Sequence, residues 1–295
     1  MLFDGFEVAD VETPRGAVRA RLAGAGPPLL LLHGFPETHL MWHAVAPRLA
    51  ERFTIVAADL PGYGDSFRPV PADDHAPHAK RALAEDLVAA MARLGHDRFA
   101  VAGHDRGGRV GYRMALDHPA VVTRLAVLDI VPTGAIWAGA DDRFALGYWH
   151  WPFLAQPAPL PEQLILGSPD GFWLAIERMG VKPGDDRYPD EVVAAYRAQL
   201  ADPGFVTAMC EDYRAGATVD RELDDADRAA GRTIACAARA LWAGAGALPL
   251  FYDDPLELWR PYAADITGRA VEGASHFLVE DAAEDVAADL AGFFG

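Results

Sequence analysis

The chain has 295 residues, of which 51% are hydrophobic and 23% are charged, values typical of an ordinary globular protein. Its 26 lysines and arginines stand against 43 aspartates and glutamates, so its formal net charge at pH 7 is −17. This charge disfavours non-specific binding to nucleic acid or to an anionic membrane, and we expect neither as a partner. An anionic substrate must then be bound by local arginines against the overall field.

The N-terminal segment and the cysteines indicate in which cellular compartment the protein is expected. Residues 1–7 are acidic and lack a basic region followed by an apolar stretch, so we expect no signal peptide. The longest aliphatic run, Leu29–Leu32, is far too short to cross a membrane. Cys210 and Cys236 are the only cysteines and lack metal-ligand spacing, which indicates free thiols in a reducing compartment. We therefore predict a cytoplasmic protein without a metal site.

The first half of the chain alternates between strand and helix patterns. Residues 3–22 loosely alternate apolar and polar side chains around Thr13–Gly16, which is typical of an antiparallel hairpin. Leu29–Leu32 is an unbroken apolar run, as expected for a parallel strand that is covered on both faces. The segments that follow predict a helix, a strand, a helix, a strand, a helix and a strand at residues 40–51, 53–58, 80–94, 98–102, 110–116 and 122–130. This order predicts an α/β fold with a doubly wound, mostly parallel sheet.

The pattern changes near Pro132. No buried strand is expected between residues 133 and 227, where four tryptophans and a proline cluster are concentrated. Strands are predicted again at residues 237–242 and 269–271, before a last helix at 282–294. The acidic run Asp224–Asp227 is expected to be a solvated edge. We therefore predict an inserted helical cap domain, residues 133–227, on a core domain made of residues 1–132 and 228–295.

The stretch Gly103–Arg109 lies where a predicted strand turns into a helix. Gly103 and the pair Gly107-Gly108 leave room for a tight turn that pushes the residue between them out of the sheet edge, as in a nucleophile elbow. That residue is Asp105, so the chemistry would be a carboxylate attacking carbon. Alternatively, Asp105 only caps the helix N-terminus, where acidic residues are favoured. The stretch by itself leaves both interpretations open.

Two further residues favour the nucleophile. His276 lies in a loop after the last predicted strand, a position that suits a catalytic base, although loop histidines are often simple surface residues. The histidine needs an orienting acid, and we expect it to be Asp129, at the end of the strand over residues 122–130. The segment after the strand 237–242 holds no carboxylate before Asp253. Asp129 as a polar strand end that caps a neighbouring loop is the alternative.

The run His33-Gly-Phe-Pro36 follows the strand that ends at Leu32. Here the backbone N–H of Phe35 can form an oxyanion hole with the N–H of Arg106, the residue after the nucleophile. A simple turn that ends the strand also explains this run.

Together these segments resemble the fluoroacetate dehalogenases of the α/β-hydrolase superfamily, and the resemblance covers nearly the whole chain. It is carried by Gly103–Arg109, the run from His33 to Pro36, Asp129 and the cap run Tyr148–Trp151. The resemblance implies an α/β-hydrolase fold, a homodimer and no metal or organic cofactor. It also implies that the substrate carboxylate is bound by Arg106 and Arg109, and that the halide is received by His150, Trp151 and Tyr213.

Physical reasoning supports these assignments. Arg106 and Arg109 lie three residues apart at the start of a helix, so their guanidiniums can converge on one anion. The side chains of His150, Trp151 and Tyr213 each offer one hydrogen-bond donor to a departing fluoride. The alternatives are that Arg109 packs outward and that the cap aromatics serve only packing.

The predicted reaction is the hydrolytic dehalogenation of a small 2-haloacid such as fluoroacetate to the 2-hydroxy acid, glycolate, and halide. Asp105 forms an aspartyl ester, which is hydrolysed by water that His276 and Asp129 activate. The alternative is an epoxide hydrolase with the same triad and with Tyr148 and Tyr213 as proton donors.

Arg106 argues against that alternative, because a neutral epoxide has no carboxylate to bind. A catalytically silent ligand-binding relative would need none of the three triad residues. The sequence leaves open which halogen and which chain length are preferred.

Overall fold

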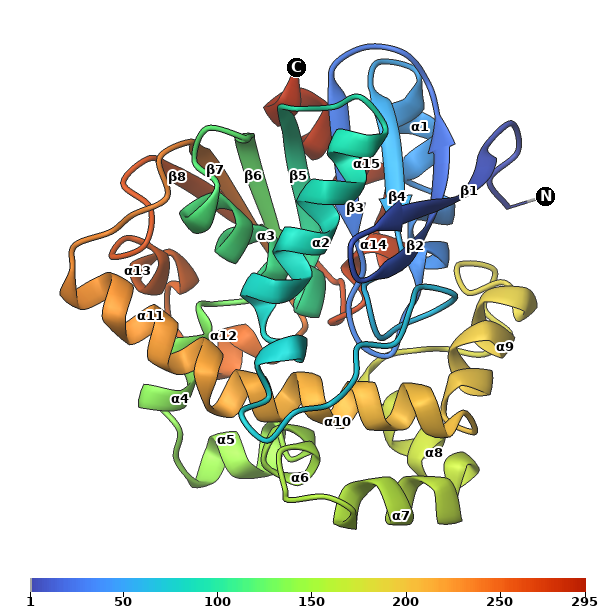
Figure 1. The fold of residues 1–295 in the computed structure, drawn as a ribbon, viewed down its shortest axis with the longest axis vertical. Helices are drawn as coiled ribbons and strands as arrows, with labels where there is room; N and C mark the ends of the chain where they lie inside the picture. The colour runs from blue at the N-terminus through green and yellow to red at the C-terminus, as the bar shows by residue number, and fades with distance from the viewer. Residues whose placement is uncertain (1) are drawn as a thin grey trace.

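The computed structural model describes residues 2–295 as one mixed sheet with helices on both faces and a layer of helices across one end (Figure 1). Eight strands form the sheet in the order β1-β2-β4-β3-β5-β6-β7-β8. β1 and β2 form the predicted antiparallel hairpin, β2 is also antiparallel to β4, and all other neighbouring strands are parallel. The strands span Glu7–Thr13 (β1), Gly16–Ala23 (β2), Pro28–Leu32 (β3), Thr54–Ala58 (β4), Phe99–His104 (β5), Val122–Leu128 (β6), Ala237–Ala243 (β7) and Ile266–Val271 (β8).

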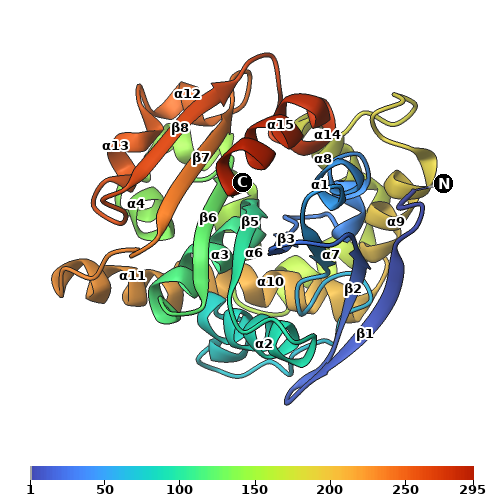
Figure 2. The ribbon, with the colours of Figure 1, turned by 90° about the horizontal axis from the view of Figure 1, so that it is seen from above.

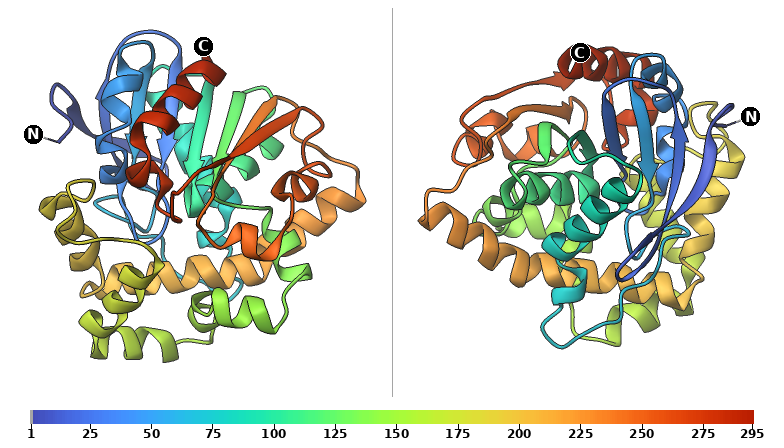
Figure 3. Two further views of the ribbon diagram at one scale, coloured as in Figure 1. Left: turned by 180° about the vertical axis from the view of Figure 1, so that it is seen from behind. Right: turned by 45° about the horizontal axis from the view of Figure 1, so that its top comes forward.

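The sheet is doubly wound, as predicted, and it twists from β8 to β1 (Figure 2). The helices α2 and α3 cover one face, and α1 and α15 cover the other (Figures 1 and 3). The helices outside the cap layer span His39–His43 (η1, a 3₁₀ helix), Ala46–Ala50 (α1), Ala76–His78 (η2, also 3₁₀), Lys80–Arg93 (α2), Asp105–Asp117 (α3), Leu248–Phe251 (α12), Pro255–Trp259 (α13), Leu278–Asp281 (α14) and Ala283–Phe294 (α15).

One predicted helix is wrong in detail. The single helix expected at residues 40–51 is two short helices, η1 and α1, that are separated by Ala44 and Val45. Pro47 lies in the first turn of α1. Because proline has no amide N–H, it cannot donate to the carbonyl of His43 and continue the preceding turn.

Residues 133–229 contain helices and no strand, and every residue of this stretch is described by the structure. The long helices α10 and α11 cross beneath the strand ends, and the other helices lie around them (Figures 1 and 3). The division into core and cap domains remains our interpretation of this arrangement. The cap helices span Thr133–Ala138 (α4), Asp142–Gly147 (α5), His150–Leu154 (α6), Leu160–Gly167 (α7), Pro169–Met179 (α8), Asp190–Gln199 (α9), Pro203–Ala217 (α10) and Val219–Ala229 (α11).

The prediction of a solvated acidic edge at Asp224–Asp227 is wrong for two of its three aspartates. Asp224 and Asp227 are buried on the inner face of α11. Asp224 accepts hydrogen bonds from the hydroxyl of Tyr112 at 2.8 Å and from the N–H of Gly134 at 3.0 Å, while Asp227 pairs with Arg113. Buried carboxylates persist where such partners satisfy them, and only the tertiary structure brings these partners together.

The sheet directs its loops toward the cap. The leucines of β3 are at most 1% exposed, as the unbroken apolar run predicts for a strand covered on both faces. Because β3 and β5 to β8 are parallel, the loops after them emerge at the same edge of the sheet, beside the cap helices. Ligands of doubly wound sheets bind at this edge. Among residues 2–295, no helix has the length and apolar character needed to span a membrane.

Candidate active site

Asp105 is placed by the turn from β5 into α3. Its backbone has a positive φ of 41°, which is uncommon for a residue with a side chain. A Cβ atom on Gly103 would lie 2.4 Å from the carbonyl oxygen of Gly107, and one on Gly107 would lie 2.4 Å from that of His33. The turn is therefore as tight as a nucleophile elbow requires, and only glycine fits at these two positions.

The carboxylate of Asp105 points away from the helix that it begins. The N-cap residue of α3 is His104, which makes no side-chain capping bond. Instead, Oδ2 of Asp105 accepts a hydrogen bond of 3.1 Å from the backbone N–H of Phe35. This geometry supports the interpretation of Asp105 as a buried nucleophile that lines a cavity over its interpretation as a helix cap.

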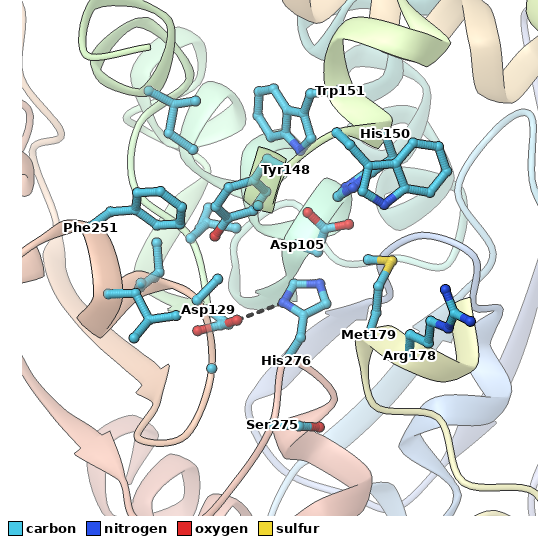
Figure 4. A pocket seen from close by; sticks show the side chains of 18 of the residues that line it. Asp105, Asp129, Tyr148, His150, Trp151, Arg178, Met179, Phe251, Ser275 and His276 are labelled. Atoms are coloured by element: carbon cyan, nitrogen blue, oxygen red, sulfur yellow. Dashed lines mark hydrogen bonds and ion pairs between the residues drawn. The ribbon is translucent and has the colours of Figure 1, made fainter. Parts of the chain in front are cut away.

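His276 and Asp129 meet at the ends of distant strands. Nδ1 of His276 donates to Oδ2 of Asp129 at 2.6 Å, and Oδ1 of Asp129 accepts from the backbone N–H of Ala243 at 2.9 Å (Figure 4). Asp129 directly follows β6 and also has a positive φ, of 51°. Since the proton of the imidazole is held on Nδ1, its Nε2 is free to accept a proton. The predicted acid and base are thus brought together.

The charges around Asp105 keep its carboxylate ionised. Burial alone raises the pKa of Asp105, but the nearby imidazole of His276 and the guanidiniums of Arg106 and Arg109 outweigh burial and lower it to about 2. A carboxylate attacks carbon only in its charged form. The candidate nucleophile is therefore in its reactive state at every pH at which the protein is expected to work.

Arg106 is buried and has its own counter-ion. Its Nε donates to Oδ2 of Asp212 at 2.5 Å, and its Nη2 donates to the backbone carbonyl of Asp212 at 2.8 Å. The guanidinium carbon also lies 4.1 Å from the ring centre of Tyr213. Two of the roughly five N–H donors of Arg106 are thus used by Asp212 on cap helix α10, which also pairs with its charge.

Arg109 is equally buried but makes no salt bridge within residues 2–295. Its Nη1 donates to the carbonyl of Val131 and to the hydroxyl of Thr133, both at 3.0 Å and both neutral. Its Nε is buried without a hydrogen-bond partner among residues 2–295. Its guanidinium carbon lies 4.6 Å from the ring centre of Trp151. Arg109 therefore presents the less compensated of the two charges, and it does not pack outward.

The cap aromatics form one cluster. The ring centre of Tyr213 lies 5.9 Å from that of His150 and 5.9 Å from that of Trp151. In the part of the chain that the structure describes, Nδ1 of His150 and the hydroxyl of Tyr213 are buried and have no partner. Burial lowers the pKa of His150 to about 3 and raises that of Tyr213, so both groups are neutral. Unpartnered buried polar atoms of this kind are rare and call for an explanation such as a ligand.

A cavity of about 530 Å³ joins these groups. Its wall includes the three triad residues, Arg109, Tyr148, His150 and Trp151 (Figure 4). Arg106, Tyr213 and Phe35 are not part of this wall, although Phe35 and Tyr213 are in ring contact at 5.8 Å. Within residues 2–295, no three His, Cys, Asp or Glu side chains are grouped as metal ligands.

Two parts of the site were not predicted from the sequence. The first is the charge network around Asp212, which pairs with Lys80 as well as with Arg106 and accepts a hydrogen bond from Tyr63 at 3.1 Å. Lys80 also pairs with Asp220 at 3.1 Å. Lys80 and Asp212 are 132 residues apart in the chain. The only available signal was that Asp212 directly precedes Tyr213.

The second is a charged histidine behind the triad. Nδ1 of His104 bonds to Glu37 at 2.9 Å, and its Nε2 donates to the backbone carbonyl of His276 at 2.8 Å. Burial lowers the pKa of His104, but the carboxylate of Glu37 outweighs burial and raises it to about 9. His104 is therefore an imidazolium that holds the His276 loop in place. The sequence signal was its position directly before Asp105.

The chain is similar to characterised and uncharacterised hydrolases. Residues 27–163 match the family model of the alpha/beta hydrolase fold. The chain is 43% identical over 292 residues to a fluoroacetate dehalogenase from Burkholderia sp., covering 99% of this chain and 95% of the relative. It is 32% identical over 280 residues to a soluble epoxide hydrolase from Corynebacterium sp. (strain C12), covering 88% and 87%.

Two solved structures, whose functions are assigned only provisionally, have the same fold. One is an alpha/beta hydrolase from Nostoc sp. PCC 7120, with a TM-score of 0.95, 42% identity and coverage of 99% of both chains. The other is an epoxide hydrolase from Pseudomonas aeruginosa, with a TM-score of 0.91, 45% identity and coverage of 100% of this chain and 97% of the other. The chain therefore belongs to the α/β-hydrolase family and is, over its whole length, a relative of the fluoroacetate dehalogenases.

Proposed function

We propose that this protein hydrolyses the carbon–halogen bond of small 2-haloacids, for example fluoroacetate to glycolate and fluoride. The observation that supports this proposal most directly is the position of Asp105 and Arg109 in one cavity. The ionised carboxylate of Asp105 shares a cavity with Arg109, whose buried guanidinium pairs only with neutral acceptors. A buried guanidinium that makes no salt bridge and keeps an unpartnered N–H within residues 2–295 favours an anionic ligand. The 43% identity to a fluoroacetate dehalogenase supports the same substrate class.

In the first step, a carboxylate oxygen of Asp105 attacks the α-carbon of the haloacid, opposite the halogen. The carbon–halogen bond breaks, and the halide leaves with the bonding electron pair. The substrate carboxylate is held by Arg109 and by the part of the Arg106 guanidinium that Asp212 does not occupy. The product of this step is an ester between Asp105 and the acid.

The departing halide is received by the cap. The hydroxyl of Tyr213, the indole N–H of Trp151 and the imidazole of His150 supply hydrogen bonds, and the first and last of these have no other partner within residues 2–295. Neutral His150 has one N–H to donate. Donors that are already in place stabilise a compact charge as it develops, which matters most for fluoride.

In the second step, water hydrolyses the ester. Nε2 of His276 takes a proton from water, and the resulting hydroxide attacks the carboxyl carbon of Asp105. The backbone N–H groups of Phe35 and Arg106 stabilise the oxyanion. Collapse of the intermediate breaks the ester, the hydroxy acid leaves with the proton from His276, and Asp105 regains its charge by releasing a proton.

Isotope labelling tests the ester route. In a single turnover in water enriched in oxygen-18, mass spectrometry of the digested protein should find the label in the peptide that contains Asp105. Label found only in the hydroxy acid, with Asp105 unlabelled, would show that water attacks the substrate directly.

The His276→Asn variant separates the two steps. It should release one equivalent of halide and accumulate the ester, visible as an adduct mass on Asp105, because alkylation needs no base. The matched control is Asp105→Asn, which should form no adduct. Steady turnover by His276→Asn would contradict the proposed role of the histidine.

One observation favours epoxide hydrolysis as the second candidate. Tyr148 lines the cavity, and burial raises its pKa, so it is protonated and could donate to an epoxide oxygen. Parallel assays with a fluoride electrode on fluoroacetate and with chromatography on styrene oxide separate the two reactions. We expect fluoride release and no diol.

The cytoplasmic location and the homodimer also remain predictions.

A further inference from the structure

We propose that the substrate class of this site extends to 2-haloacids with an apolar chain on the α-carbon, which is bound in an apolar lobe of the cavity. This inference rests on the proposed dehalogenation. We define the apolar lobe as the side of the cavity formed by Ile130, Ile136, Leu248, Leu250 and Phe251. None of these side chains offers a hydrogen bond or a charge to a ligand.

The cavity is much larger than the smallest substrate requires. Its volume of about 530 Å³ lies in the range of pockets that bind drug-sized ligands, about 300–1,000 Å³. Fluoroacetate has two carbons, two oxygens and one fluorine. Even if each of these atoms takes the share of a water molecule in the liquid, ~30 Å³, fluoroacetate fills at most roughly 150 Å³. Most of the cavity is left for another part of a substrate.

The apolar lobe is formed by side chains that are packed into the core and the cap. Ile130 follows β6, Ile136 lies on α4, and Leu248 begins α12; all three are at most 3% exposed. Leu250, by contrast, is 68% exposed, so the lobe reaches solvent beside α12. Core and cap thus both contribute to it, and its deep part is lined by buried aliphatic side chains.

Phe251 is held in its position in the lobe. Its ring centre lies 5.4 Å from that of Tyr148, and the guanidinium of Arg143 lies over it at 5.6 Å. A Cβ atom on Gly147 would lie 2.8 Å from Cζ of Phe251, so a larger residue there would displace the ring from α5. Figure 4 shows Phe251 on one side of Asp105 and His276, with Met179 and Arg178 on the other.

The other groups of the site direct the α-carbon chain into the apolar lobe. The polar wall beside Asp105 takes the carboxylate at Arg109 and the halide at His150 and Trp151. In-line attack by Asp105 then leaves only two positions on the α-carbon, one for hydrogen and one for a substituent. Of the space that remains, the side bordered by Phe251 is apolar, whereas Arg178 lies on the opposite side. A hydrocarbon chain gains from burial on the apolar side, whereas a polar chain loses its hydration.

A substrate series tests the inference without any variant. The two acids compared, 2-chloropropionate and 2-chlorohexanoate, react at the same kind of carbon and differ only by three methylene groups. A buried methylene improves binding roughly fourfold. With chloride release as the assay, we expect the longer acid to show a kcat/KM at least tenfold above the value for the shorter acid. An equal or lower value for the longer acid would overturn the inference.

The Ala247→Phe variant tests the location. Ala247 lines the cavity just before α12 and takes no part in the proposed chemistry. A phenyl ring there should lower kcat/KM for the longer acid, 2-chlorohexanoate, at least tenfold and that for chloroacetate less than threefold. An equal loss for both acids would contradict the apolar lobe as the binding place.

The two proposals fail in different ways. If chloroacetate and fluoroacetate release halide but the longer acid is not preferred, only the further inference fails. If none of these acids releases halide, the proposed function itself fails. If Ala247→Phe does not fold, as judged by its thermal unfolding, the substrate series on the unchanged protein still decides.

Discussion

The sheet side and the cap side of the site differ in how their polar atoms are satisfied. On the sheet side, both oxygens of Asp129 accept hydrogen bonds, and Asp105 accepts one from the N–H of Phe35. On the cap side, Nδ1 of His150 and the hydroxyl of Tyr213 are buried with no partner within residues 2–295. The carboxylate of Asp129 on the sheet side is therefore fully hydrogen-bonded in the free protein, whereas the cap side keeps two buried polar atoms for which we propose the halide as a partner.

This difference has an energetic meaning. A buried polar group without a partner costs about 1–3 kcal/mol of stability. The edge-to-face contacts of Tyr213 with His150 and Trp151 offset part of that cost, at about 0.5–1.5 kcal/mol per pair. The proposed acid–base pair is thus held by hydrogen bonds, and the unmet hydrogen bonds of the cap lie where we propose that the halide departs.

Asp129→Asn should have the largest effect, because it changes the hydrogen bond that orients His276. An asparagine can place its amide N–H₂ toward His276 and favour the wrong tautomer, so we expect kcat to fall by about 10⁴-fold. The first turnover should still release one equivalent of halide. Steady-state and burst measurements of fluoride check both statements. Asp142→Asn, on the exposed start of α5, is the control, and a kcat within tenfold of normal would contradict the role of Asp129.

Tyr213→Phe should have the next largest effect, because it removes one unpartnered donor and keeps the ring over Arg106. We expect kcat/KM for fluoroacetate to fall by about 10²–10³-fold, the usual cost of removing one such donor. Chloroacetate should lose less than tenfold, because chloride spreads its charge more widely. Tyr262→Phe, another buried tyrosine that does not line the cavity, is the control. Equal losses for both halides would mean that Tyr213 does not contact the halide.

Asp224→Asn tests how the two sides are joined, since Asp224 on cap helix α11 accepts a hydrogen bond from Tyr112 on core helix α3. Burial raises the pKa of Asp224 to about 6, against about 3.9 in an unfolded chain. The folded protein therefore holds this proton more tightly, and the stability that it contributes is complete below pH 4 and lost as the pH rises through 6. The asparagine variant lacks this loss, which is at most about 3 kcal/mol.

Thermal unfolding at several pH values measures this effect. The Tm of Asp224→Asn relative to that of the unchanged protein should rise between pH 4 and pH 7. A difference in Tm that is the same at every pH would show that Asp224 does not titrate in this range.

Arg178→Gln should have the smallest effect. Arg178 is exposed, lines the cavity and makes no salt bridge within the described residues, in a chain whose net charge is −17 (Figure 4). It can attract anions to the mouth of the cavity. We expect a roughly threefold lower kcat/KM for fluoroacetate at low ionic strength, an unchanged kcat, and no difference at about 1 M salt, where charges are screened within ~3 Å. Arg260→Gln, at an exposed arginine outside the cavity, should change nothing.

Several features of the site were predictable because their causes are local. The glycines around Asp105 and the change from strand to helix periodicity lie within one short stretch, so the elbow is visible in the sequence. The placement of Asp129 and His276 after strands follows from the parallel sheet, whose strand ends must meet at one edge. Their hydrogen bond of 2.6 Å agrees with that prediction.

Other features depend on contacts between distant segments. One exception is local: Pro47 breaks the helix predicted at residues 40–51, but the helical periodicity of that segment led to the prediction of a single helix. The burial of Asp224 and Asp227 could not be foreseen, because their partners come from other helices. The same holds for Asp212, whose partner Lys80 is 132 residues away and which occupies the charge of Arg106 that the sequence assigns to the substrate.

The amino-acid sequence by itself therefore determined the doubly wound core, the elbow and the pairing of His276 with Asp129, because these rest on periodicity, glycine spacing and strand order. Only the tertiary structure decided which arginine keeps an uncompensated charge, which cap donors lack partners, and how much apolar space lies beside Asp105. Those properties arise where side chains from distant segments pack together and exclude water from one another. A local sequence pattern does not predict which distant segments will be in contact.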